Sequence, residues 1–267
     1  MMLSELLVGG LLVTGGAFGL ARLQRARLYA RLNAKIAALK RLPSPFGMPA
    51  EAAMSRPNFA DRVVSMEGFL PAAAFAALKT ELQQLVVERS FIPTHKKGGT
   101  VAYETLVTRT PAIVSLYHDS AFQNFVSRVV GEVLVPTPIQ DQSSLSLLIY
   151  DRPGDHIGWH YDHNFYWGRH FTVLLSLANE GCALGNLSHA TLMAKTPTRE
   201  ISVRTPPNTL VVFEGARVLH KVTPIEAGEK RVILSMTYCT DPRASLIQGI
   251  VRRVKDMAFF GIRSLWT

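Results

Sequence analysis

Three side chains that can ligate a metal stand at a spacing that a β-sheet would bring together. His160 and Asp162 lie one residue apart, and His220 follows 58 positions after Asp162, at the end of a strand-like run. Side chains of a strand alternate between its two faces, so His160 and Asp162 would point the same way, with Tyr161 turned away. Two histidines and one carboxylate on one face of an octahedral metal leave three positions open. The spacing predicts an iron site with room for a co-substrate and O2.

A pair of cations follows His220 at a distance that suits a co-substrate anchor. Lys230 and Arg231 come ten and eleven residues after His220 and open another strand-like apolar run. A cation there can hold the far carboxylate of a keto acid by charge-assisted hydrogen bonds. Neighbouring residues of a strand face opposite ways, so only one of the two can point inward. The sequence leaves open which one does.

Taken together, these residues resemble the pattern of the Fe(II)/2-oxoglutarate-dependent dioxygenase superfamily, in its prolyl-4-hydroxylase-like branch. The resemblance covers roughly residues 64–240. The matching parts, in chain order, are Tyr150, Pro153-Gly154, His160-x-Asp162, the run TVLLSL at 172–177, His220, Pro224, Gly228 and Lys230-Arg231.

This resemblance implies a role for each matching residue. The iron ligands that it implies are His160, Asp162 and His220. It also implies that Tyr150 hydrogen-bonds 2-oxoglutarate and that Lys230 or Arg231 holds the far carboxylate of that co-substrate. The implied reaction is hydroxylation of a C–H bond by O2, with release of succinate and CO2. The implied cofactors are Fe(II), 2-oxoglutarate and, as an accessory reductant, ascorbate.

Two departures and two other classes of protein bear on this interpretation. Asp162 is retained, which argues against the halogenating relatives, where a small residue leaves space for halide. The segment 181–192 stands where the family often has a Gly-Gly pair, so the resemblance says little about the substrate. A catalytic Zn2+ site could use the same three ligands and make the chain a hydrolase. A non-catalytic, membrane-tethered adaptor could keep the fold as a binding surface.

Short strand-like runs with turn signals between them predict the fold. We expect a mainly β protein with flanking helices, built as a double-stranded β-helix (jelly roll). The runs are 144–150, 171–178, 188–194, 200–204, 209–215 and 231–239. Helices are expected at 71–87, after Pro71, and at 110–131, with Asp119 or Ser120 as a cap. The basic, Gly-containing segment 95–106 is interpreted as a loop, either a mobile one near the pocket or one whose charges lie in solvent.

The N-terminal region differs from the rest in composition. Residues 1–21 are apolar except for Ser4, Glu5 and Thr14, and residues 22–41 hold seven basic side chains and no acidic one. These 41 residues carry +6 of the net charge of +9, so nucleic acid is not expected as a partner. We expect an N-terminal membrane-anchor helix with a basic juxtamembrane helix. The positive-inside rule then places the catalytic domain in the cytosol. A mitochondrial presequence and a helix that never spans a membrane stay open.

These patterns divide the chain into four parts. They are a membrane anchor with its basic helix at 1–41, a proline-rich linker at 42–60, a dioxygenase domain at 61–242 and a basic amphipathic tail at 243–267. The tail suits either a membrane-surface helix or a helix that closes the domain. The two cysteines do not form a disulfide framework, so a reducing compartment is expected. The substrate is expected to be a lipid, a membrane-adjacent small molecule or a protein side chain.

Overall fold

A computed structural model describes residues 22–41, 59–85, 87–92 and 96–260. Its centre is an antiparallel sheet of twelve strands. The strands are β1 Val63–Met66, β2 Glu88–Ile92, β3 Lys96–Val101, β4 Val135–Pro136, β5 Leu145–Tyr150, β6 His156–His160, β7 His170–Glu180, β8 Leu192–Lys195, β9 Glu200–Val203, β10 Leu210–Phe213, β11 Leu219–Val222 and β12 Lys230–Cys239. The hydrogen-bonded order is β1-β10-β7-β12-β5-β3-β6-β11-β8-β9, with β2 beside β3 and β4 beside β12.

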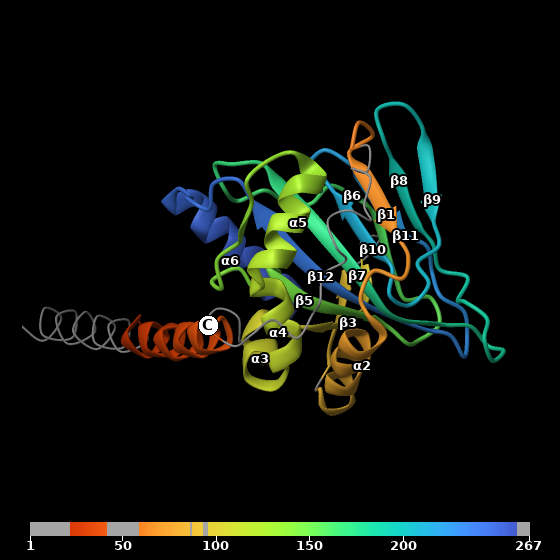
Figure 1. The fold of residues 1–267 in the computed structure, drawn as a ribbon, viewed down its shortest axis with the longest axis horizontal. Coiled ribbons are helices and arrows are strands. Elements are labelled where there is room, and N and C mark those ends of the chain that lie inside the picture. The colour runs from red at the N-terminus through yellow and green to blue at the C-terminus, as the bar shows by residue number, and fades with distance from the viewer. Residues whose placement is uncertain (1–21, 42–58, 86, 93–95, 261–267) are drawn as a thin grey trace, which may run out of the picture.

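This order makes two groups of strands that β3 joins. One group runs from β1 to β5, and the other runs from β6 to β9 through β11 and β8. The sheet curls until it is almost closed, so the inner faces of the two groups enclose one interior (Figure 1). The expected mainly β, jelly-roll architecture is confirmed at this level.

The helices lie on the side of the sheet away from β8 and β9 (Figure 1). They are α2 Ala72–Thr80, α3 Tyr103–Arg109, α4 Pro111–His118, α5 Ser120–Val130 and α6 Leu246–Phe260. The expected helix after Pro71 is α2, continued by a short 3-10 turn, Glu81–Gln84. The second expected helix divides at Asp119, whose carboxylate accepts a hydrogen bond from the Phe122 backbone at 2.8 Å. This contact satisfies one of the backbone donors that a helix start leaves free.

Strand β12 shows how the sheet separates two environments. Val232, Leu234 and Met236 point to the helices and are buried in the main core. Ile233 belongs to a second cluster inside the sheet, and Ser235 faces the same interior. Because side chains alternate along β12, the face toward the helices is apolar, and the face toward the interior of the sheet carries both apolar and polar side chains.

The basic N-terminal helix, residues 22–39, packs against the domain. Its Tyr29, Leu32 and Ile36 are buried in the same core cluster as α2 to α5. No helix in the described ranges is long and apolar enough to cross a membrane. The expected membrane anchor at 1–21 lies outside the described residues and stays a prediction.

The C-terminal tail and the segment 95–106 had more than one interpretation from the sequence, and the structure describes most of both. The C-terminal helix α6 contacts β2 and β3, and its Asp256 and Phe260 are buried, which is the arrangement of a helix that closes the domain. The interpretation of 95–106 as a solvated loop is wrong, because these residues supply β3 and the start of α3. Gly98 stands where a side chain would press on the Ile149 carbonyl of the next strand, with a Cβ only 3.2 Å from that oxygen.

Candidate metal centre

The sheet brings the three metal-type side chains together. His160 ends β6 and stands opposite His220 of β11 in the antiparallel register. Their rings lie 4.1 Å apart between centroids. Asp162 follows β6, and its backbone N–H donates to the Gly215 carbonyl at 3.0 Å, which holds the carboxylate beside the two rings.

The ligand atoms converge on one point. Asp162 Oδ1 lies 3.6 Å from His160 Nε2 and 3.7 Å from His220 Nε2. All three ligand atoms lie within 4.8 Å of one another. These separations suit atoms that share one ion at about 2.0–2.2 Å from each. The geometry can therefore hold a divalent metal on one face.

Backbone carbonyls fix which nitrogen of each histidine faces the metal position. The His160 Nδ1–H donates to the Gly158 carbonyl at 2.8 Å, and the His220 Nδ1–H donates to the Val218 carbonyl at 2.9 Å. A carbonyl can only accept, so in both rings Nδ1 carries the proton and Nε2 keeps its lone pair. Both histidines are thereby oriented as ligands before any ion arrives.

The charge states of Asp162 and His220 fit the same role. At His160, burial would lower the pKa of the ring, but Asp162 outweighs burial and raises that pKa, so a metal would displace a proton from this ring. Burial alone would raise the pKa of the Asp162 carboxyl, but His220 and His160 outweigh it and hold that pKa well below its usual range. Burial lowers the pKa of His220, which favours its neutral form. A deprotonated carboxylate and a neutral imidazole are the forms that bind metals.

Asp162 is confined on its other side. The Thr172 hydroxyl donates to its Oδ2 at 2.5 Å, so Oδ1 is left to face the histidines. A Cβ at Gly215 would overlap both the Asp162 carboxylate and the Thr172 hydroxyl. Only glycine therefore leaves room for this carboxylate.

We expect Gly215→Ala to lower the iron affinity by about 10- to 100-fold, the range seen when groups that orient metal ligands are lost. The added methyl displaces the Asp162 carboxylate. The measurement is a calorimetric titration with Fe(II) without O2. Gly249→Ala is the matched control, because a Cβ there meets no atom within 4 Å. Equal iron affinity in the Gly215 and Gly249 variants would contradict this role.

A cavity of about 60 Å³ lies on one side of the triad, next to His220. Arg231 lines it, is only 1% exposed and contacts the Thr205 hydroxyl at 3.2 and 3.4 Å. Among the described residues no carboxylate pairs with Arg231. A buried charge without a counter-charge is costly, so this guanidinium fits a ligand that brings a carboxylate.

Tyr150 and Lys230 are the other two residues that were expected to bind the co-substrate. Tyr150 lines the same cavity, and its buried hydroxyl has no hydrogen-bond partner in the described part of the chain. Such orphaned buried groups are rare in folded proteins. Lys230 begins β12 and is exposed, facing away from Arg231. The sheet thus turns Arg231 inward and Lys230 outward.

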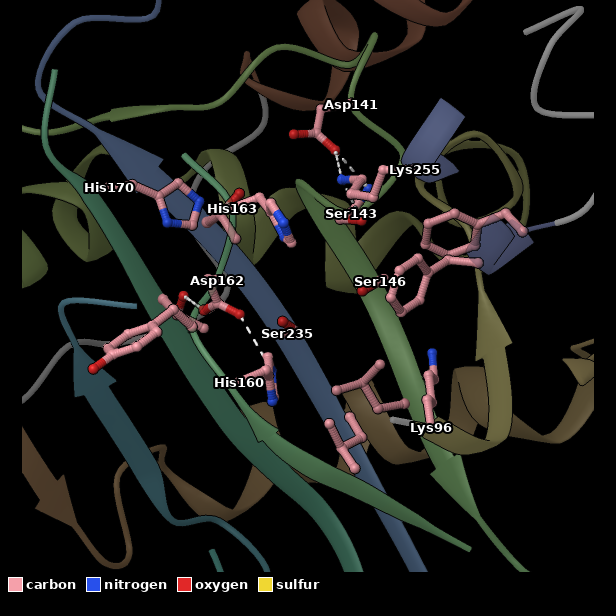
Figure 2. A pocket seen from close by; sticks show the side chains of 17 residues that line it. Lys96, Asp141, Ser143, Ser146, His160, Asp162, His163, His170, Ser235 and Lys255 are labelled. Atoms are coloured by element: carbon pink, nitrogen blue, oxygen red, sulfur yellow. Dashed lines mark hydrogen bonds and ion pairs between the residues drawn. The ribbon is translucent and has the colours of Figure 1, made fainter. Parts of the chain in front are cut away.

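A larger cavity, of about 140 Å³, adjoins the smaller one at His160 and Asp162 and is not lined by His220 or Arg231. Figure 2 shows His160 and Asp162 on one wall, with Lys96 on the opposite wall. Lys255 and Asp141 lie at its far end and form an ion pair at 2.8 Å. The sequence identified none of these last three side chains individually, although segment 95–106, which contains Lys96, was one candidate for a loop near the pocket.

The remaining histidines have other positions. His163 and His170 line the larger cavity, and His170 is buried with no partner for its Nδ1 among the described residues. His189 lies at the surface and pairs with Glu229 and Glu226. These three form a second group that could hold an ion, yet His189 and both carboxylates already engage one another or the backbone.

Comparison with known proteins agrees with this geometry. Residues 48–246 match the family model "Halogenase D", so the chain belongs to that family. No curated protein is similar enough in sequence to count as a relative. The solved structures that share this fold include Fe(II)/2-oxoglutarate oxygenases.

Three solved structures illustrate the shared fold. A prolyl hydroxylase from Trichoplax adhaerens, solved with a peptide of hypoxia inducible factor, is 15% identical with a TM-score of 0.52, over 72% of this chain and 87% of that one. A prolyl-4-hydroxylase from Pseudomonas putida is 18% identical with a TM-score of 0.52, over 69% and 94%. The epimerase SnoN of nogalamycin biosynthesis, in complex with Fe3+ and alpha ketoglutarate, is 15% identical with a TM-score of 0.53, over 76% and 84%.

Proposed function

We propose that the chain is an Fe(II)- and 2-oxoglutarate-dependent oxygenase that hydroxylates a C–H bond. The proposed iron ligands are His160, Asp162 and His220. The observation that carries the proposal is the buried Arg231 guanidinium, which has no carboxylate partner among the described residues and lies beside a metal-type triad. A cation in that position serves no purpose in a simple hydrolytic zinc site, whereas a dicarboxylate co-substrate supplies the missing negative charge.

Arg231 and Tyr150 would hold 2-oxoglutarate in the smaller cavity. The guanidinium offers several N–H donors to the far carboxylate, and the Tyr150 hydroxyl offers one more. The cavity is closed around them by apolar residues, so these charge-assisted bonds form away from water and are strengthened. The keto-acid end then lies toward His220, because the same cavity is lined by that ring.

The iron, when bound with 2-oxoglutarate and O2, supplies the oxidising power that places an oxygen atom on the substrate while the keto acid becomes succinate and CO2. The chain contributes orientation. Two Nδ1–H bonds fix the histidine rings, and Thr172 fixes the Asp162 carboxylate. The larger cavity, which adjoins the smaller one but is not lined by Arg231, is the proposed place of the substrate.

The family name raises halogenation as a second reaction, and Asp162 is the residue that bears on this choice. Its Oδ1 lies within 3.7 Å of both histidine Nε2 atoms and so fills the third ligand position. The halogenating relatives have a small residue there, which leaves space for halide. Asp162 therefore supports oxygenation.

We expect chloride to have no specific effect on co-substrate binding. With Asp162 in place, the Kd for 2-oxoglutarate of the Fe(II)-loaded chain should agree within about twofold between chloride and sulfate buffers of equal ionic strength, because exposed charges respond to ionic strength alone. The measurement is anaerobic calorimetry. Binding that is tenfold or more tighter in chloride would indicate that halide occupies a metal position, and would favour halogenation.

The adaptor and zinc alternatives are separated by metal content. Full-length chain purified from cells and measured by elemental analysis should contain iron near one per chain after anaerobic loading. A chain that does not bind Fe(II) would support the adaptor. The hydrolase would be supported if 2-oxoglutarate binding were equal with Fe(II) and with Zn2+ and if the chain were active without O2. Membrane association and a cytosol-facing or mitochondrial location remain proposals from residues 1–41.

A further inference from the structure

Lys96 is a buried cation that the proposed chemistry does not use. It begins β3, where it stands opposite Ile157 of β6 in the sheet. It is 2% exposed and lines the larger cavity together with His160 and Asp162. Figure 2 shows its nitrogen end directed toward the side of the cavity where Ser146 lies.

The ammonium group of Lys96 has no carboxylate partner in the described ranges. Lys96 makes a cation–π contact with Phe259, in which Nζ lies 4.9 Å from the ring centroid. Burial, together with the charge of Lys255, lowers the pKa of Lys96 to about 7. Near neutral pH such a lysine is partly neutral, and a ligand of opposite charge in the cavity would stabilise its charged form.

Lys255, which lines the same cavity, differs from Lys96 in that carboxylates balance its charge. Its Nζ lies 2.8 Å from Asp141 Oδ1 and 3.1 Å from Asp256 Oδ1, and it donates to the Ser143 hydroxyl at 2.9 Å. The other oxygen of Asp141 accepts from the Tyr166 hydroxyl at 3.0 Å. Of the two lysines that line the cavity, only Lys96 lacks a carboxylate partner among the described residues.

One part of the lining is apolar and suits a short hydrocarbon, while Ser235 and Thr237 add hydroxyls elsewhere in the cavity. Leu148, Ile157, Phe259 and Phe260 provide apolar surface, and Ser146 adds a hydroxyl. The volume of about 140 Å³ is close to that of an apolar cavity of roughly 150 Å³ that accommodates benzene. One unmatched positive charge balances one negative charge, which favours a carboxylate over a phosphate dianion.

We propose that the substrate is a small organic acid whose carboxylate pairs with Lys96 and whose hydrocarbon part lies between Lys96 and the triad. This inference rests on the proposed oxygenase function, since it names the substrate class of the same site. The chain would then hold two carboxylates in the two adjoining cavities. Arg231 would take that of the co-substrate and Lys96 that of the substrate.

The first test measures binding of a simple probe, hexanoate, to the full chain loaded anaerobically with Fe(II) and 2-oxoglutarate. The neutral isostere hexanamide and inorganic phosphate are titrated in parallel by calorimetry or ligand-observed NMR. We expect hexanoate to bind at least about tenfold more tightly than hexanamide, the effect of one buried charge-assisted bond. Lys96→Met should remove that preference and Lys96→Arg should restore much of it.

Lys97→Met is the matched control, because Lys97 is the next residue of β3, faces the other way and donates to the Pro153 carbonyl. It should keep the preference for hexanoate. Lys96→Met should not lower the Tm, since it replaces an unpaired buried charge by an apolar side chain. Hexanoate preference that survives in Lys96→Met, or a wild-type preference for phosphate, would overturn the proposal.

Two further titrations separate this inference from the function on which it rests: 2-oxoglutarate is titrated into the iron-loaded chain, and hexanoate and hexanamide are titrated into the chain without iron and 2-oxoglutarate. If 2-oxoglutarate fails to bind but Lys96→Met still loses affinity for hexanoate relative to hexanamide, the anion site stands and the oxygenase assignment fails. If 2-oxoglutarate binds and Lys96→Met keeps the preference, only the role of Lys96 fails.

Discussion

Replacing Arg231 by methionine should raise the KM for 2-oxoglutarate by at least about 30-fold, because truncating one partner of a buried charge pair costs roughly 2–5 kcal/mol. Arg231 is the buried cation of the smaller cavity and contacts only the Thr205 hydroxyl among the described polar groups. Methionine fills similar space without a charge, so the co-substrate carboxylate would be left unpaired. The measurement is succinate formation at varied 2-oxoglutarate with saturating Fe(II).

The adjacent Lys230 provides the control on the same strand. Lys230→Met removes an exposed lysine one position away, and we expect its KM to stay within about twofold of wild type, as for most surface substitutions. The calorimetric Kd for 2-oxoglutarate should follow the same order. A large effect of Lys230→Met with a small effect of Arg231→Met would contradict the assignment of the anchor.

Replacing Asp162 by alanine should weaken Fe(II) binding by about 100-fold or more, since the loss of a ligand exceeds the 10- to 100-fold cost of losing a group that merely orients one. Its Oδ1 is the carboxylate atom that faces both histidine Nε2 atoms. Succinate formation should fall below detection. The two measurements are iron per chain after gel filtration and succinate formation at matched protein concentration.

Asp61→Ala tests whether any loss of a carboxylate has this effect. Asp61 accepts from the Thr198 hydroxyl at the surface, and its other contact is Arg199, so its removal leaves the triad intact. That variant should retain iron and succinate formation. Wild-type iron affinity and turnover in Asp162→Ala would show that Asp162 is not a ligand.

The part of the site that the sequence predicted is the part that local geometry determines. Strand alternation places His160 and Asp162 on one face, and a hydrogen-bonded register then brings His220 opposite His160. The choice between Lys230 and Arg231 could not be made in this way. Strand β12 carries apolar residues on both faces, such as Ile233 toward the interior of the sheet and Val232 toward the helices. Its sequence therefore does not reveal whether the even-numbered or the odd-numbered residues face the interior.

Lys96 was missed for a different reason. Its segment reads HKKGGTV, in which adjacent lysines and glycines are typical of a solvated loop. The strand forms because β2 pairs with one edge of it and β5 and β6 share the other edge, where the glycines permit close approach to β5. The burial of Lys96 also depends on Phe259 of α6, which is 163 positions away in the chain. Contacts of that range cannot be read from a local pattern.

The N-terminal helix gives a similar lesson about composition. Five of the seven basic residues of segment 22–41 lie in this helix, and they predicted a juxtamembrane segment, yet Tyr29, Leu32 and Ile36 pack into the core of the domain. Their spacing of three and four is that of an amphipathic helix, which suits a protein core and a membrane surface equally. The face formed by Tyr29, Leu32 and Ile36 is assigned to the protein core only because the helices of the domain pack against it.

The central claim, oxidation driven by 2-oxoglutarate at an iron site, is tested most directly by succinate release. The full chain is incubated with Fe(II), ascorbate and 2-oxoglutarate, under air and under argon, and succinate is measured by mass spectrometry. We predict slow succinate release that requires Fe(II) and O2, that Zn2+ does not support and that a small organic acid accelerates. An iron-loaded chain that binds 2-oxoglutarate but releases no succinate under air, with or without such an acid, would contradict the account.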